Sequence, residues 1–201
     1  MKLKRILSLA LSGVLAVSML TACGFGGNGT DIFRPGNQSA SFARVLNSKQ
    51  DMLDYGTSDS KLSDAIYTVV RSMDADDVVT SGAVTGDIAT TVKTLTGYGD
   101  LNSGSAWQAQ DESGTYVKVY VYDANNDLYN TLDEVATIVK DDLAPMDLNS
   151  DAAKANAGFT NAYEGNVAVY SVSFPAANSG DEDTKAWVIG VSIEQTATAI
   201  K

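Results

Sequence analysis

The hydrophobic period of the chain changes near residue 100, and this change restricts the possible folds more than any other feature of the sequence. Before it, apolar residues such as Leu62, Ile66 and Val69 recur at the spacing of an amphipathic helix. After it, Val117 and Val119 alternate with polar or aromatic residues, which is typical of a β-strand. Helices followed by strands predict an α+β domain with an antiparallel sheet.

The first half of the globular region is expected to form three helices. Apolar residues fall on one face at 42–53 and again at 62–73, where Ser58 to Ser60 supplies the N-terminal cap. A third helix is expected over Asp87 to Thr96, because Gly97 follows it as a C-terminal stop. These apolar stripes are interpreted as core.

The second half is expected to form about four strands and a helix. Alternating patterns predict strands at 107–110, 115–122, 167–174 and 185–194. Turns are expected at 111–114 and 178–183, a helix at 128–140, and a short helix around 151–156. The order β-β-α-β-β places the longer helix on one face of the sheet, and residues 40–201 are expected to form one domain.

The N-terminus has the layout of an export signal. Lys2, Lys4 and Arg5 precede an apolar run from Ile6 to Leu20 that is too short for a confident membrane span, so residues 1–22 are interpreted as a signal peptide. An alternative is a plain signal peptide that is cleaved elsewhere, with the following cysteine incidental.

The segment Leu20-Thr21-Ala22-Cys23 resembles the lipobox of bacterial lipoproteins. The resemblance implies that the Cys23 sulfur receives a diacylglyceryl group and that the mature chain starts at this residue. Two acyl chains anchor a protein stably where one gives marginal binding. We therefore expect an exported chain, held by its lipid at the outer face of a bacterial cell membrane.

Glycines directly after the lipobox admit a second interpretation. Gly24, Gly26 and Gly29 match the G-x-G-x-x-G spacing of a dinucleotide-binding turn, but no strand precedes them and no helix pattern follows. Residues 23–39 are rich in Gly and Asn, which is typical of a flexible tether with a span of about 20 Å.

Composition removes several classes of function. The chain has no histidine and a single cysteine, Cys23, which excludes Ser-His-Asp and Cys-His catalysis and the common zinc sites. Lys2, Lys4 and Arg5 lie within residues 1–22, so the exported chain keeps 11 basic against 25 acidic residues, a charge of −14. This charge excludes nucleic acid. We expect a non-enzymatic interaction or accessory module without a cofactor, whose partner is a protein or a cell-wall glycan.

One segment carries calcium-type ligands. Asp123, Asn125, Asp127 and Glu134 stand at positions 1, 3, 5 and 12 of a loop of the EF-hand type, but Leu128 replaces the glycine that such a loop needs at position 6. The alternative is that Asp127 or its neighbour caps the following helix. A calcium- or glycan-binding surface lipoprotein is therefore a second hypothesis.

A row of tyrosines offers a different binding surface. If the valines of 115–122 face the core, Tyr116, Tyr120 and Tyr122 line the opposite face of the strand. An exposed row of this kind stacks on sugar rings or packs on a partner protein. The alternative is that the N-terminal helices cover this face and make the tyrosines part of the core.

A hydrolase is the least favoured hypothesis. Ser58 to Lys61 matches the S-x-x-K motif of penicillin-binding proteins and related β-lactamases, but the K-[ST]-G element that those enzymes need is missing. Paired carboxylates at Asp141 and Asp142, or at Asp181 and Asp183, are equally well explained as solvated charge.

Overall fold

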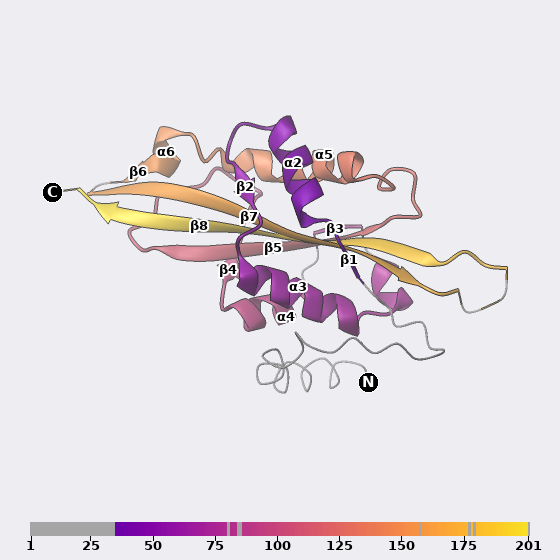
Figure 1. Cartoon of the computed structure of the whole chain (residues 1–201). Coiled ribbons are helices and arrows are strands. Elements are labelled where there is room, and N and C mark those ends of the chain that lie inside the picture. The colour runs from indigo at the N-terminus through magenta and orange to yellow at the C-terminus, as the bar shows by residue number, and fades with distance from the viewer. Residues whose placement is uncertain are drawn as a thin grey trace.

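A twisted sheet lies between two layers of helices (Figure 1). The computed structural model describes residues 35–200 apart from 80, 84, 85, 157, 177 and 179, so the lipobox and Cys23 lie outside the described residues. Three long strands form the centre of the sheet: β5 (Gly114–Asp123), β7 (Phe159–Phe174) and β8 (Thr184–Ala199). β8 is central and pairs antiparallel with both neighbours.

Five strands of two residues each line the two edges of this sheet. They are β1 (Gly36–Asn37), β2 (Tyr55–Gly56), β3 (Gly82–Ala83), β4 (Gly99–Asp100) and β6 (Ala155–Asn156). β1, β2 and β6 pair with β7, whereas β3 and β4 pair with β5, and the β2 and β4 pairings are parallel. Short edge strands of this kind reduce the risk that the sheet pairs with another chain.

Helices cover both faces of the sheet. One layer contains α2 (Ser39–Lys49), α5 (Leu132–Leu143) and α6 (Asp151–Lys154), and the other contains α3 (Ser60–Ser72) and α4 (Asp87–Thr96) (Figure 1). Two 3₁₀ turns, η2 (Ala75–Val79) and η3 (Ala144–Met146), follow α3 and α5. Within the described residues, no helix is long and apolar enough to cross a bilayer.

Alternation along the strands divides the core into two parts. Tyr120, Val169 and Ile189 point toward the layer of α2 and α5, whereas Val119, Ala168 and Val188 point toward α3 and α4. Successive side chains of a strand face opposite sides, so both sets of apolar residues are buried. The sheet therefore needs a helical layer on each face.

The α+β class is confirmed, but two parts of the predicted architecture are wrong. The sheet has eight strands where about four were expected, because two-residue strands carry no detectable period. The helices do not all precede the sheet, since α5 and α6 follow β5.

The predicted strand at 107–110 is also wrong. The backbone N–H groups of Trp107 and Ala109 donate to the carbonyls of Met146 in η3 and Ala152 in α6, so this segment does not join the sheet. Its alternation reflects one-sided burial in an irregular segment, and β5 begins at Gly114 without a preceding hairpin partner.

Other observed element boundaries differ from the predicted ones by a few residues at most. α4 matches its predicted range, with Gly97 at φ 75° as the stop. α5 begins at Leu132, after the predicted start at 128, because Thr131 and Glu134 form a capping box. The fold also begins before residue 40, since Gly36 and Asn37 already pair with β7.

Gly190 controls how closely α3 approaches β8. A Cβ at this position would lie 2.8 Å from Ile66 and 2.9 Å from Leu62. Replacing Gly190 with Ala should therefore lower the free energy of unfolding by about 1–3 kcal/mol. Gly104→Ala is the control, because its Cβ meets nothing closer than 3.6 Å and should change stability by less than about 0.5 kcal/mol. Urea unfolding measures both, and equal effects would contradict the packing explanation.

Candidate functional site

The predicted exposed tyrosine row is not formed. Tyr120 and Tyr122 are 1% and 2% exposed and pack in the core under α2 and α5. Tyr116 is half-buried, with its ring 5.0 Å from that of Trp107 in an edge-on contact. Helices cover this face of the sheet, as the alternative interpretation expected, although α5 shares the covering with the N-terminal helix α2.

A polar cluster lies between β5 and α5. Three donors converge on one carboxylate oxygen, Oδ2 of Asp142, from Lys118 Nζ at 2.7 Å, the Tyr120 hydroxyl at 2.7 Å and Ser103 Oγ at 2.8 Å. Burial alone would raise the pKa of Asp142, but the hydrogen bonds from Lys118, Tyr120 and Ser103 outweigh it and lower the pKa. The pKa of Tyr120 is raised by burial and by its bond to Asp142.

This cluster fits a structural role better than catalysis. Lys118 Nζ also donates to Ser103 Oγ at 2.6 Å, which resembles a Ser–Lys pair, but Lys118 Nζ and Ser103 Oγ both donate to Asp142 as well, so the carboxylate engages both groups. Ser103 is 1% exposed, so a substrate does not reach it. Asp141 pairs with Lys140 and is not part of the cluster, so the adjacent carboxylates do not act together.

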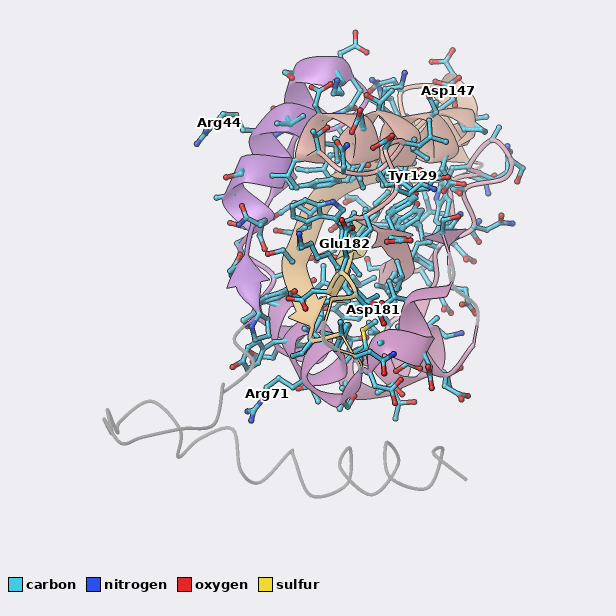
Figure 2. The ribbon with its side chains drawn as sticks, turned by 90° about the vertical axis from the view of Figure 1, so that its right-hand side faces the viewer. Arg44, Arg71, Tyr129, Asp147, Asp181 and Glu182 are labelled. Atoms are coloured by element: carbon cyan, nitrogen blue, oxygen red, sulfur yellow. The ribbon has the colours of Figure 1, made fainter. Side chains whose placement is uncertain are left out.

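The second carboxylate pair belongs to the turn between β7 and β8. Asp181 accepts a hydrogen bond from Asn178, and Asp183 accepts one from the backbone N–H of Ala176. Figure 2 shows Asp181 and Glu182 in this turn, which lies nearest the viewer. These groups hold the turn and do not face a common point.

Three of the four predicted calcium ligands are hydrogen-bonded to other groups of the protein. Asp123 accepts from the backbone N–H of Asn125, whose side chain bridges to the backbone of Asp183 and Lys185. Glu134 belongs to the capping box of α5. Asp127 is exposed. In the described part of the chain, no three acidic side chains are grouped so as to hold a metal ion, and calcium binding by this loop stays a prediction.

The S-x-x-K segment joins α3 to the sheet. Ser58 Oγ donates to Asn166 Oδ1 at 3.0 Å, and Asp59 caps α3 while it accepts bonds from Tyr98 and Ser192. Burial, followed by the negative charge of Asp59, raises the pKa of Tyr98 to about 12. The segment lines a groove of about 280 Å³, but its polar groups stabilise the start of the helix.

A cavity lies where α2 and α5 end. It has a volume of about 530 Å³ and is enclosed by the two helix ends and by the segments 50–55 and 144–149. Its lining combines charged and amide side chains with an apolar floor: Lys49, Gln50, Asp51, Lys140, Asp147 and Asn149 over Leu46, Met52 and Leu143. Figure 2 shows Asp147 on this helical layer, across the sheet from Arg71. Cavities of this size hold small ligands.

Tyr55 is the unusual residue of this cavity. Its side chain is 3% exposed, and its hydroxyl has no hydrogen-bond partner among the residues that the structure describes. Burial raises the pKa of the hydroxyl far above its ordinary value, so it stays protonated and remains a donor. An unpaired buried hydroxyl costs about 1–3 kcal/mol of stability.

Tyr55 is held firmly in this position. The side chain of Asn47 donates to the Tyr55 carbonyl at 3.0 Å and accepts from its N–H at 2.9 Å. Gly165 on β7 leaves space for the ring, because a Cβ there would lie 2.6 Å from it. The unpaired hydroxyl is therefore fixed by its surroundings.

A second cavity of about 400 Å³ adjoins the first and shares Met52 and Asn149 with it. Asn161, 8% exposed, lines this cavity. Its Nδ2 donates to the Gln110 carbonyl at 3.0 Å, while its Oδ1 has no partner in the described ranges of the chain. We name these two spaces the paired cavities. One residue that lines each cavity, Tyr55 in the first and Asn161 in the second, carries a side-chain polar atom that is buried and has no partner among the described residues.

Sequence reasoning missed the paired cavities. Their walls come from α2, the 50–55 segment, α5, the 144–149 segment and β7, which are far apart in the chain. No spacing rule connects such segments. The one available signal was the density of Asn, Gln and Asp at the predicted helix ends, which is equally typical of turns.

Replacing Asp142 with Asn should lower the free energy of unfolding at pH 7 by about 1–2 kcal/mol, because Lys118 loses its ionic partner and the Tyr120 hydroxyl loses a charged acceptor. The folded-state pKa of Asp142 is lowered, so its stabilisation is present above the ordinary pKa of Asp and disappears as the pH falls through the folded value. Urea unfolding at pH 7 and at about pH 3 should show a difference between the proteins that shrinks in acid. A constant difference would argue against this role.

Replacing Tyr55 with Phe should leave the free energy of unfolding unchanged or raise it by up to about 1 kcal/mol, because only an unpaired hydroxyl is removed. Tyr163→Phe is the matched control. The Tyr163 hydroxyl donates to the Ala153 carbonyl at 2.6 Å, so its loss should cost about 1 kcal/mol. Thermal and urea unfolding compare the two variants, and equal destabilisation would mean that the Tyr55 hydroxyl has a partner.

Comparison with known proteins provides no further assignment of the paired cavities. No protein-family model, curated protein or solved structure matches this chain.

Proposed function

We propose that this protein is a lipid-anchored, non-enzymatic binding module at the outer face of a bacterial cell membrane. The observation that carries the location is the lipobox-like segment Leu20 to Cys23 after a basic and apolar N-terminus. A diacylated Cys23 anchors the chain stably without a spanning helix.

The distance from Cys23 to the folded part supports this arrangement. The first described residue, Pro35, follows Cys23 by twelve positions, and β1 begins at the next residue. Twelve extended residues reach about 40 Å, and a flexible chain of this length spans about 20 Å. The folded part therefore has room to stand clear of the lipid headgroups.

A binding role is favoured over catalysis by the chemistry of the side chains. The sequence has no histidine, and the Ser–Lys pair at Ser103 and Lys118 is held by Asp142. The paired cavities are the best candidate for the ligand site, because their volumes and their mixed charged, amide and apolar lining suit a small ligand.

Growth of expressing bacteria with radiolabelled palmitate tests the location. The full chain should become labelled and sediment with membranes, whereas Cys23→Ser should lose the label and accumulate as the unprocessed precursor. Gly27→Ala, just beyond the lipobox, is the control and should be labelled normally. Globomycin should block cleavage of the labelled chain. An unlabelled wild-type chain would refute the proposed anchor.

A further inference from the structure

We propose that the second of the paired cavities binds a short peptide in extended conformation, which pairs through its backbone with the outer edge of β7. This inference rests on the proposed binding role of the paired cavities. It is carried by an opening between the short strands along β7, by the direction of the backbone groups in that opening, and by the cavity beside it.

The short strands on the outer edge of β7 leave an opening between them. β6 pairs with residues 159–160 of β7, and β2 pairs with residues 165–166. Residues 161–164 have β8 as their partner strand on the inner side and no partner strand on the outer side among the described residues. We name residues 161–164 the edge opening.

Hydrogen bonds near the two ends of β7 show which backbone groups face outward. In an antiparallel ladder, successive residues direct their N–H and C=O groups to opposite sides. Val169 C=O accepts from Gln38 on the outer side, whereas Gly158 C=O accepts from Ile200 on the β8 side. The register with β8 is unbroken from 159 to 174, so odd-numbered residues face outward. The N–H and C=O of Tyr163 therefore face the edge opening.

These two groups of Tyr163 have no hydrogen-bond partner in the part of the chain that the structure describes. If β2 continued backward in its register of Tyr55 with Gly165, Leu53 would lie opposite Tyr163. The Gln50 side chain prevents this, because it accepts from the Leu53 N–H at 3.1 Å and donates to the Leu53 carbonyl at 2.6 Å. The 50–53 segment is thus bonded to itself and leaves Tyr163 open to another chain.

The second cavity borders the edge opening. Four consecutive residues of β7, 160–163, line this cavity. Successive side chains of a strand point to opposite faces, so a space that touches all four residues lies beside the strand edge and not over a single face. Its volume of about 400 Å³ is in the range of small-ligand sites.

The chemistry of this space suits a peptide. A residue of an extended peptide offers one N–H and one C=O on the same side, which match the C=O and N–H of Tyr163. Such main-chain bonds form with any sequence, whereas pockets beside the edge select the side chain. Met52, Leu53 and Leu148 line the cavity and provide an apolar wall for one side chain of the ligand.

Calorimetric titration of the purified full chain in detergent tests the proposal. The probe is the N-acetylated, C-amidated tripeptide alanyl-leucyl-alanine, for which we expect saturable binding. The same peptide with a methyl group on every backbone nitrogen should bind at least tenfold more weakly, because it has no N–H for the Tyr163 carbonyl.

Two variants test the edge opening from the protein side. Tyr163→Pro removes the outward N–H, and Tyr163→Ala is the matched control that keeps it. Both variants lose the ring and its hydrogen bond to the Ala153 carbonyl. A proline whose N–H position faces outward removes no ladder bond to β8. We expect Tyr163→Pro to bind the tripeptide at least tenfold more weakly than Tyr163→Ala, and urea unfolding checks that both are folded.

Four results would overturn the proposal. They are a flat titration with the tripeptide, equal affinity for the N-methylated peptide, equal affinity of folded Tyr163→Pro and Tyr163→Ala, and tighter binding of tetra-N-acetylchitotetraose than of the tripeptide, which would indicate a glycan site. If Tyr163→Pro does not fold, the N-methylated peptide still decides on the wild-type chain.

The titration does not depend on lipidation. Failure of the tripeptide with normal palmitate labelling therefore rejects this inference alone, and binding without labelling rejects the proposed anchor alone.

Discussion

The pairing of β7 with β8 is the interaction on which the rest of the structure depends. Each strand has sixteen residues, and the pairing runs without interruption from Phe159 opposite Ala199 to Phe174 opposite Thr184. Such a strand pair is marginal by itself and needs further strands and covering helices. β5 adds to the free edge of β8, short strands cover the outer edges, and the apolar residues on both faces require two helical layers. The apolar pattern of the strands therefore requires the two helical layers.

Covering a long sheet with short helices also explains where the cavities lie. α2 and α5 pack on the central part of the sheet and end before its margin (Figure 1). Beyond their ends, the segments 50–55 and 144–149 line the first cavity. Loops fill space less completely than helices packed side by side. Tyr55 and Asn161 lie at this margin, and their buried atoms without a partner are a local loss of stability.

Sequence patterns were informative where one period ran over a whole element. The helix at Asp87 to Thr96 and the strands that became β5 and β8 show this, because burial of one side repeats over ten or more residues. The patterns failed where partners were distant. The sequence of 115–122 does not reveal that Asp142 forms a salt bridge with Lys118 and accepts a hydrogen bond from Tyr120. These contacts allow helices to cover a strand that has a lysine in its middle. The same distance in sequence hid the paired cavities.

The route of the chain relates the proposed anchor to the paired cavities. The fold begins with β1, where Gly36 pairs with Ser171 near one end of β7, whereas Asn161 and Tyr163 line the second cavity near the other end. Ten residues of β-strand separate Ser171 from Asn161, which corresponds to about 33 Å. An anchor at Cys23 therefore leaves the domain at the end of the sheet that is remote from this cavity. Under the proposed lipid anchor, the second cavity therefore lies at the end of the sheet opposite to the end where the fold begins.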